Sequence, residues 1–202
     1  MTTVQRDFPL FPLNTVLFPG SRLPLQIFEP RYIDLVRDCL RTDQGFGLVA
    51  IRDGREAGAA ATPWHVGTLA RIVDWDQGEN GLLKILVEGG QRFDILETRV
   101  GAGQLVVADV TWRQAVLTAE CAIPFRQLKV VVENLLEKNS AAAVGESLLA
   151  IAQPTAFVYA LLDLLQLPPA LKVEFLDIDV SDALVNAALE LLRALDPRKS
   201  HH

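Results

Sequence analysis

The sequence comprises 202 residues with a formal net charge of −6 and an apolar fraction of 50%. This length suits one large domain or two small ones, and the apolar content is sufficient for a buried core, which excludes extensive disorder. The acidic balance disfavours a broad nucleic-acid-binding surface, although a local basic patch stays open. There is no stretch of about 18 apolar residues and no signal peptide, so we expect a cytoplasmic protein without a membrane segment.

An apolar stretch from Phe8 to Tyr32 opens the chain and carries prolines at positions 9, 12, 19, 24 and 30. Proline fixes φ and lacks an N–H, so this stretch cannot form one helix and should consist of short extended pieces joined by turns. Pro30 suits the first turn of a helix, and the apolar residues after it recur at helical spacing as far as about Leu40. We therefore expect entry strands followed by an amphipathic covering helix.

Short strands with tight turns are predicted for the part of the chain after this helix. We expect a strand at 46–51, an exposed loop at 52–62, and a hairpin with strands at 66–75 and 82–88 around the turn 76–81. The pair Gly89-Gly90 is expected to break the second strand, and further strands are expected at 91–98 and 104–112. The pattern predicts a mostly antiparallel sheet that closes toward a barrel.

The apolar period becomes helical after about residue 117. Helices are expected at about 125–138, 146–152, 155–165, 170–176 and 181–195. We therefore divide the chain into a β-rich part, residues 1–115, a helical part, residues 116–197, and a tail, residues 198–202. The tail closes with a His-His pair, which we exclude from any metal argument.

Several segments, in their order and spacing, resemble the Lon N-terminal, or substrate-binding, domain family. They are the runs Phe8 to Leu13, Phe28 to Tyr32 and 46–49, together with 67–72, 90–93, 161–165, 171–176 and 182–192. The resemblance covers about residues 7–196. It implies an α+β fold, in which a PUA-like, mostly antiparallel β pseudobarrel with a covering helix precedes an all-helical C-terminal subdomain. It also implies a role in selecting and holding protein substrates.

The sequence lacks the motor and protease signals of the full-length Lon enzyme. No Gly-rich phosphate loop ending in Gly-Lys-Ser/Thr occurs, and no lysine stands in that pattern. The serine–lysine protease domain is also missing. The resemblance therefore implies a standalone recognition module without ATPase and protease domains.

Independent catalytic chemistry finds little support in the residues. His65 is the only histidine inside the expected fold, so a histidine-based metal cluster is excluded and a structural or surface role is favoured. Cys39 and Cys121 lack metal-ligand spacing and are expected to be buried free thiols, with a disulfide or a reactive thiol as the alternative. The acidic residues of the hairpin turn favour a solvated turn, with a weak cation site as the alternative; they are Asp74, Asp76 and Glu79. We expect no enzymatic activity, no metal and no cofactor.

Five residues are candidates for ligand contacts: Glu29, Arg31, Trp64, Trp75 and Trp112. Glu29 and Arg31 flank the first residue of the predicted covering helix. A structural role is favoured for them, in which Glu29 caps backbone N–H groups or pairs with a nearby arginine (Arg22, Arg31 or Arg92). The alternative is a ligand contact in a cleft between barrel and helices. The tryptophans are expected to pack at the core or its rim, unless an exposed aromatic patch makes them a peptide platform.

We expect a non-catalytic module that holds unfolded or peptide segments of client proteins. Binding would use a groove between barrel and helix, or an open sheet edge to which the client adds a strand. A separate ATPase or protease is a further candidate partner, whereas nucleic acid and membranes are not expected. The alternatives are a PUA-like nucleic-acid-binding protein, which needs a basic face, and a small hydrolase with an unrecognised site.

Overall fold

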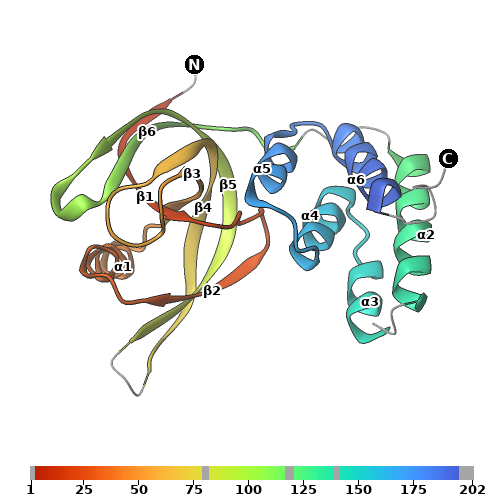
Figure 1. Ribbon diagram of the computed structural model, residues 1–202, viewed down its shortest axis with the longest axis horizontal. Coiled ribbons are helices and arrows are strands. Elements are labelled where there is room, and N and C mark those ends of the chain that lie inside the picture. The colour runs from red at the N-terminus through yellow and green to blue at the C-terminus, as the bar shows by residue number, and fades with distance from the viewer. Residues whose placement is uncertain (1–2, 79–81, 117–120, 139–141, 196–202) are drawn as a thin grey trace. The chain divides into compact units, whose positions relative to one another are not determined.

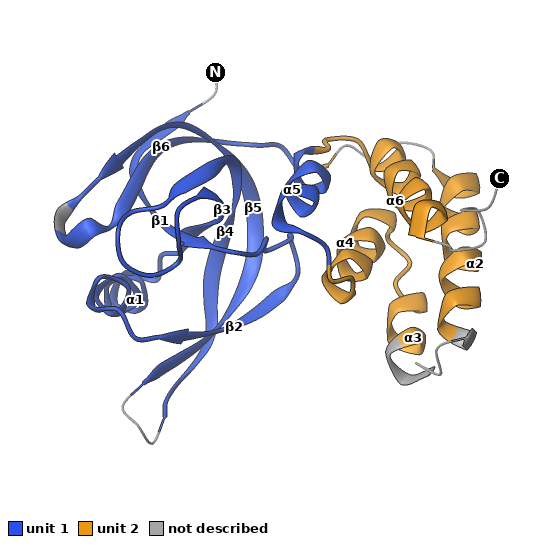
Figure 2. Cartoon of the chain, viewed as in Figure 1, with its two compact units in different colours: residues 1–115, 167–177 blue, residues 116–166, 178–202 orange. Residues whose placement is uncertain are grey.

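The computed structural model describes residues 3–78, 82–116, 121–138 and 142–195. They belong to two compact units, one of residues 1–115 and 167–177 and the other of residues 116–166 and 178–202 (Figure 2). The first unit contains β1 (Val4–Leu13), β2 (Arg22–Ile27), α1 (Pro30–Thr42), β3 (Phe46–Asp53), β4 (Thr62–Gln77), β5 (Leu83–Val100), the short 3-10 turn η1 (Ala102–Gln104), β6 (Val106–Trp112) and α5 (Pro169–Asp177). The second unit contains α2 (Ala122–Lys138), α3 (Ala142–Leu149), α4 (Pro154–Leu164) and α6 (Ser181–Leu195).

The strands of the first unit form one six-stranded sheet in the order β2-β5-β4-β3-β1-β6, and an additional β5–β6 pairing closes it into a barrel (Figure 1). The β1–β3 pair is parallel, and the other five pairs of the described strands are antiparallel. Closure is possible because β5 is 18 residues long: its first part, 83–88, pairs with β2, and its second part, 93–100, pairs with β6. The α+β fold with a mostly antiparallel sheet is confirmed.

The proline-rich opening stretch becomes β1, a turn, β2 and α1, as predicted. The second half of β1 is buried on both faces, whereas β2 alternates between exposed and partly buried residues. α1 starts at Pro30 and covers one end of the barrel core with an apolar side. That side consists of Tyr32, Leu35, Val36 and Cys39, which pack in one cluster with Phe11, Phe46 and Ile85 among others.

β5 runs without interruption, so the predicted strand break at Gly89-Gly90 is wrong. Glycine is required here by a close backbone approach. A Cβ atom on Gly89 would lie 2.1 Å from the carbonyl oxygen of Phe18. The Gly89 N–H donates to the Ser21 carbonyl at 2.9 Å, and the Gly89 carbonyl accepts from the Gly20 N–H at 2.8 Å. The register with β4 shifts beside these glycines, so they mark a bulge within a continuous strand.

The helices of the second unit bury their apolar sides against one another. α6 packs on α2 and on α4 through side chains that are almost fully buried. Lys129 of α2 lies 5.0 Å from the ring centroid of Phe125 and 5.5 Å from that of Phe157, and its ammonium donates to the Leu149 carbonyl at 2.9 Å. One cation thus binds the C-terminal end of α3 and two aromatic faces in the same small core.

Helix α5 belongs to the first unit by its contacts. The sequence-based division placed it in the helical part, residues 116–197, but it packs against β3 and β4. The buried Arg92 of β5 donates to the Leu176 carbonyl of α5 at 2.7 Å. Arg113 donates to the Asp177 carbonyl at 3.1 Å and bridges the carboxylates of Asp94 and Asp177. α5 is therefore held on the barrel by two arginines from strand β5 and the end of β6.

Some predicted features lie outside the described residues. They are the tail, residues 198–202, and the part of the hairpin turn at 79–81, which includes Glu79. Of the other acidic residues in that turn, Asp74 accepts a hydrogen bond from the backbone N–H of Trp75 at 2.9 Å. None of the helices among the described residues could cross a bilayer.

Candidate functional site

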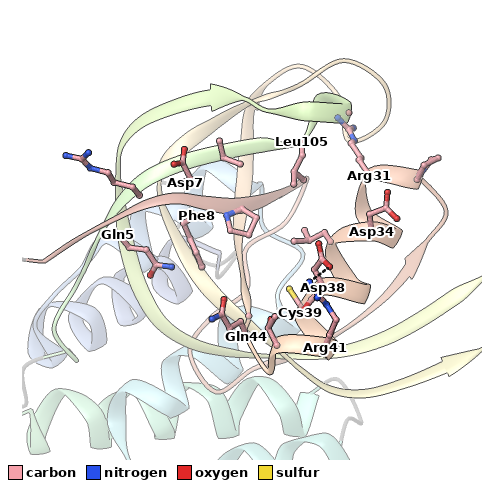
Figure 3. A pocket seen from close by; sticks show the side chains of 18 residues that line it. Gln5, Asp7, Phe8, Arg31, Asp34, Asp38, Cys39, Arg41, Gln44 and Leu105 are labelled. Atoms are coloured by element: carbon pink, nitrogen blue, oxygen red, sulfur yellow. Dashed lines mark hydrogen bonds and ion pairs between the residues drawn. The ribbon is translucent and has the colours of Figure 1, made fainter.

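Two adjoining cavities border the N-terminal half of β1, and together we call them the β1 groove. The first, of about 770 Å³, lies between β1, α1 and the start of β6, and Figure 3 shows its lining side chains. The second, of about 610 Å³, lies between β1, the end of α1 and β4. Both volumes fall in the range of about 300–1,000 Å³ typical of ligand sites. The two cavities share Gln5, Phe8, Cys39, Gln44 and Gly45.

The lining of the β1 groove is mixed, with apolar surface beside polar and charged side chains. Phe8, Leu35, Leu105 and Val107 supply apolar surface in the first cavity, where Figure 3 shows Phe8 on β1 and Leu105 near the start of β6. Leu40 of α1 and Val73 of β4 line the second cavity and are 41% and 46% exposed. The charged residues of the lining are Arg6, Asp7, Arg31, Asp34, Asp38, Arg41, Asp43 and Arg71.

A bulge in β1 shapes the mouth of the groove. The register with β6 shifts between Gln5 and Phe8, and Asp7 has a φ of 51° in the left-handed region. The Asp7 N–H donates to the Asp109 carboxylate at 3.2 Å, and Arg99 donates to both Asp7 and Asp109. The hydrogen bond from Arg99 lowers the pKa of Asp109, so this carboxylate stays ionised and holds the bulge at ordinary pH.

Glu29 and Arg31, two of the predicted contact residues, join each other at the start of α1. Arg31 Nη2 lies 2.9 Å from Glu29 Oε2, and the side chain of Glu29 makes no capping bond to the helix. Arg31 Nη1 donates to the carbonyl oxygen of Gln104 at 2.8 Å, which connects α1 to the turn before β6. The side chain of Arg31 is only 6% exposed and lies over the ring of Tyr32 at 4.6 Å. Arg31 lines the first cavity, and contact of either residue with a ligand stays a prediction.

The phenol of Tyr32 and the thiol of Cys39 are held in their neutral forms. Burial raises the pKa of Tyr32. The positive charge of Arg31 acts against this rise, and the negative charge of Glu29 adds to it. Tyr32 stacks on Phe11 with 3.9 Å between ring centroids. Burial, with a smaller contribution from Asp38, raises the pKa of Cys39 to about 11. A thiol with that pKa is a poor nucleophile at neutral pH, so covalent chemistry by Cys39 is disfavoured.

The three tryptophans do not gather into one platform. Trp112 lines the second cavity, packs edge-on against Phe8 and Phe93 at 5.4 and 5.7 Å, and donates from Nε1 to Gln5 Oε1 at 3.2 Å. Trp64 is half-buried near the start of β4, and Trp75 is 56% exposed near its end. Neither of these two lines the β1 groove.

Sequence reasoning missed most of the groove-lining residues. Gln5 and Arg6 stood outside the apolar pattern, and no local motif distinguishes them from other exposed residues. Arg71 lay within the matching run 67–72 but carried no signal of its own for a binding role. A weak signal was available in Asp7, because aspartate is one of the few residues that tolerates a positive φ.

His65 and the cysteines lie where the sequence suggested. His65 is exposed on β4, with Nε2 3.4 Å from Asp177 Oδ2, and Cys39 and Cys121 are buried free thiols. Over the described ranges, no group of three histidine, cysteine or acidic side chains is placed to hold a metal ion.

A model of the "ATP-dependent protease La (LON) substrate-binding domain" family matches residues 7–194. The chain belongs to the Lon substrate-binding domain family. This Lon-type domain is 34% identical to the crystal structure of a Lon N-terminal domain protein from Xanthomonas campestris, with a TM-score of 0.75 and coverage of 93% of this chain and 98% of that one. It shares its fold with the N-terminal domain of the Mycobacterium avium complex Lon protease, with a TM-score of 0.73, 17% identity and coverage of 93% and 98%.

Curated relatives of this Lon-type domain are much longer proteins. Lon protease 2 of Myxococcus xanthus is 32% identical over 147 residues, which are 69% of this chain and 18% of that protein. Protein cereblon of Gallus gallus is 34% identical over 135 residues, or 65% of this chain and 28% of that protein. The chain thus spans less than a third of these relatives. The predicted resemblance to the Lon substrate-binding domain is confirmed.

Proposed function

We propose that this Lon-type domain binds exposed polypeptide segments of client proteins in the β1 groove. The observation that carries the proposal is the groove itself, since two adjoining cavities of ligand-site size lie on a domain of the substrate-binding family. Apolar surface from Leu40 and Val73 would contact apolar client side chains, while flanking polar groups would meet the client backbone. Binding of this kind needs neither ATP nor a metal ion.

The client would be held rather than cleaved. Cys39 lines the groove and is a residue type that can act as a nucleophile, but its thiol stays protonated because its pKa is raised. Groove contacts of moderate area, made by a client that orders on binding, favour micromolar affinity. A separate ATPase or protease would then receive the client from this domain.

The test is fluorescence anisotropy with a labelled, reduced and carboxymethylated protein that stays unfolded. The double variant Leu40→Ser/Val73→Ser removes partly exposed apolar surface from the second cavity. At about 25 cal/mol per Å² of apolar area this should weaken binding about tenfold. The matched control is Leu96→Ser/Val100→Ser on β5, where both side chains are 56% exposed and line neither cavity. Unchanged binding in the groove variant, or no binding by the wild type, would reject the proposal.

A further inference from the structure

We propose that a client segment enters the β1 groove as an extra β-strand between the free edges of β1 and β4. This inference rests on the proposed function and specifies how the groove would hold its client. It starts from the unequal lengths of three neighbouring strands.

β3 lies between β1 and β4 in the sheet. At the end of the sheet where β3 begins, β1 and β4 both extend several residues beyond it. The β1–β3 pairing starts at Leu10, so the arm Val4–Pro9 of β1 pairs only with β6. The β3–β4 pairing reaches no further than Ala70, so the arm Arg71–Gln77 of β4 pairs only with β5. Within the described chain, both arms therefore have one edge without a strand partner, and in each case it is the edge on the side of β3.

The second cavity of the β1 groove lies between these two arms. It is lined by Gln5 and Phe8 from the β1 arm and by Arg71, Ile72 and Val73 from the β4 arm. Gln44 and Gly45, which lead into β3, also line it. The cavity thus occupies the place that β3 would fill if it began several residues earlier.

An extended polypeptide is the ligand whose chemistry fits such a place. Free strand edges present rows of N–H and C=O groups, and another extended backbone pairs with them without regard to sequence. At about 3.3 Å per residue, the six residues of the β1 arm and the seven of the β4 arm would accommodate a client segment of about six residues. Apolar side chains on one face of that segment would meet Leu40 and Val73.

The charges of the groove do not favour clients of one sign. Most charged groups of the groove are paired: Asp34 with Arg37, Asp38 with Arg41, Asp7 with Arg99 and Arg31 with Glu29. Arg6, Arg71 and Asp43 form no ion pair with another residue of the described chain and line the groove. Arg99 also contacts Glu97 and Asp109, Arg6 interacts with Asp109, and the β4 arm carries Asp74 and Asp76. The groove therefore has no excess positive charge, and backbone pairing rather than charge would recognise the client.

The open edge of β2 is the rival site for strand addition. β2 pairs with β5, and its outward positions are Arg22, Pro24 and Gln26. Pro24 has no N–H to donate, and Arg22 is engaged with Glu88 at 2.9 Å. Proline and charge are the features that protect sheet edges from pairing. The edges of the β1 groove are the better candidates for strand addition, since a cavity adjoins them.

Amide hydrogen exchange on the full chain, with and without an eight-residue apolar peptide that contains two glutamates, tests the inference. Binding should slow exchange at residues 4–9 and 71–77 and leave residues 22–27 unchanged. A peptide N-methylated at alternate amides keeps its side chains but loses donors. Alternate N–H groups of the inserted strand face β1 and β4 in turn, so methylation in either register should weaken binding at least tenfold.

The outcomes separate this inference from the proposed function. If peptide and unfolded protein bind but protection falls on residues 22–27, or neither N-methylated register weakens binding, strand addition at the β1 groove is wrong while polypeptide binding stands. If neither the peptide nor the unfolded protein binds, the proposed function itself fails.

Discussion

Replacing Gly89 by alanine should destabilise the barrel strongly, whereas the same change at the adjacent Gly90 should not. The contrast tests the close approach between β5 and the turn before β2. A Cβ on Gly89 would lie 2.1 Å from the backbone oxygen and 2.9 Å from the carbonyl carbon of Phe18. A Cβ on Gly90 would meet only Leu69, at 3.4 Å or more, which is ordinary van der Waals contact.

The expected free-energy changes follow from these contacts. Backbone atoms cannot rotate away, so the turn must move, and overpacking of this kind costs about 1–3 kcal/mol. The move would also weaken the two hydrogen bonds that Gly89 makes with Gly20 and Ser21, each with a net contribution of about 0.5–1.5 kcal/mol. The sum for Gly89→Ala is a loss of about 2–6 kcal/mol. Gly90→Ala should change stability by less than about 1 kcal/mol, because alanine there also restricts the unfolded chain.

Urea unfolding followed by tryptophan fluorescence is the suitable assay. Trp64, Trp75 and Trp112 all lie in the first unit, so the signal reports on the barrel alone. With a urea dependence of about 2 kcal/mol per M, a loss of about 3 kcal/mol lowers the midpoint by about 1.5 M. Equal midpoints for the two variants would refute the close approach and the explanation of the glycine pair.

Two further predictions concern ionisable groups. Burial opposes ionisation of Asp177, but the hydrogen bond and charge of Arg113, with His65, outweigh it and lower the pKa of this carboxyl. Because the folded-state pKa lies below the unfolded value of about 3.9, the stabilisation is present above that pH and is lost as the pH falls through the folded-state pKa. Arg113→Gln should therefore reduce the loss of barrel stability between pH 6 and pH 3 in urea titrations, and an unchanged pH dependence would contradict the ion pair. The pKa of Cys39, raised to about 11 chiefly by burial, predicts a thiol that reacts at pH 8 about 100-fold more slowly in the native protein than in urea. The measurement uses a thiol reagent on Cys121→Ser, and equal rates in both states would show that Cys39 is accessible.

Helix and strand positions were predictable where the signal is local. Pro30 marks the start of α1 because proline suits the first helical turn, and the apolar spacing after it selects one buried side. The same spacing predicted α5, but periodicity states only that a helix buries one side, not what covers it. The contact of Arg92 with Leu176, 84 residues apart, decides that α5 packs on the barrel.

The family resemblance, the β-then-α order and the entry strands were all available in the sequence, because prolines, glycines and apolar period act within a few residues. The tertiary structure alone decided that β5 continues through Gly89, since the obstruction there is the backbone of Phe18, seventy-one positions away. It also decided where the candidate site lies. The β1 groove arises because β1 and β4 extend beyond the first residue of β3. The relative length of paired strands depends on partners that are distant in the chain.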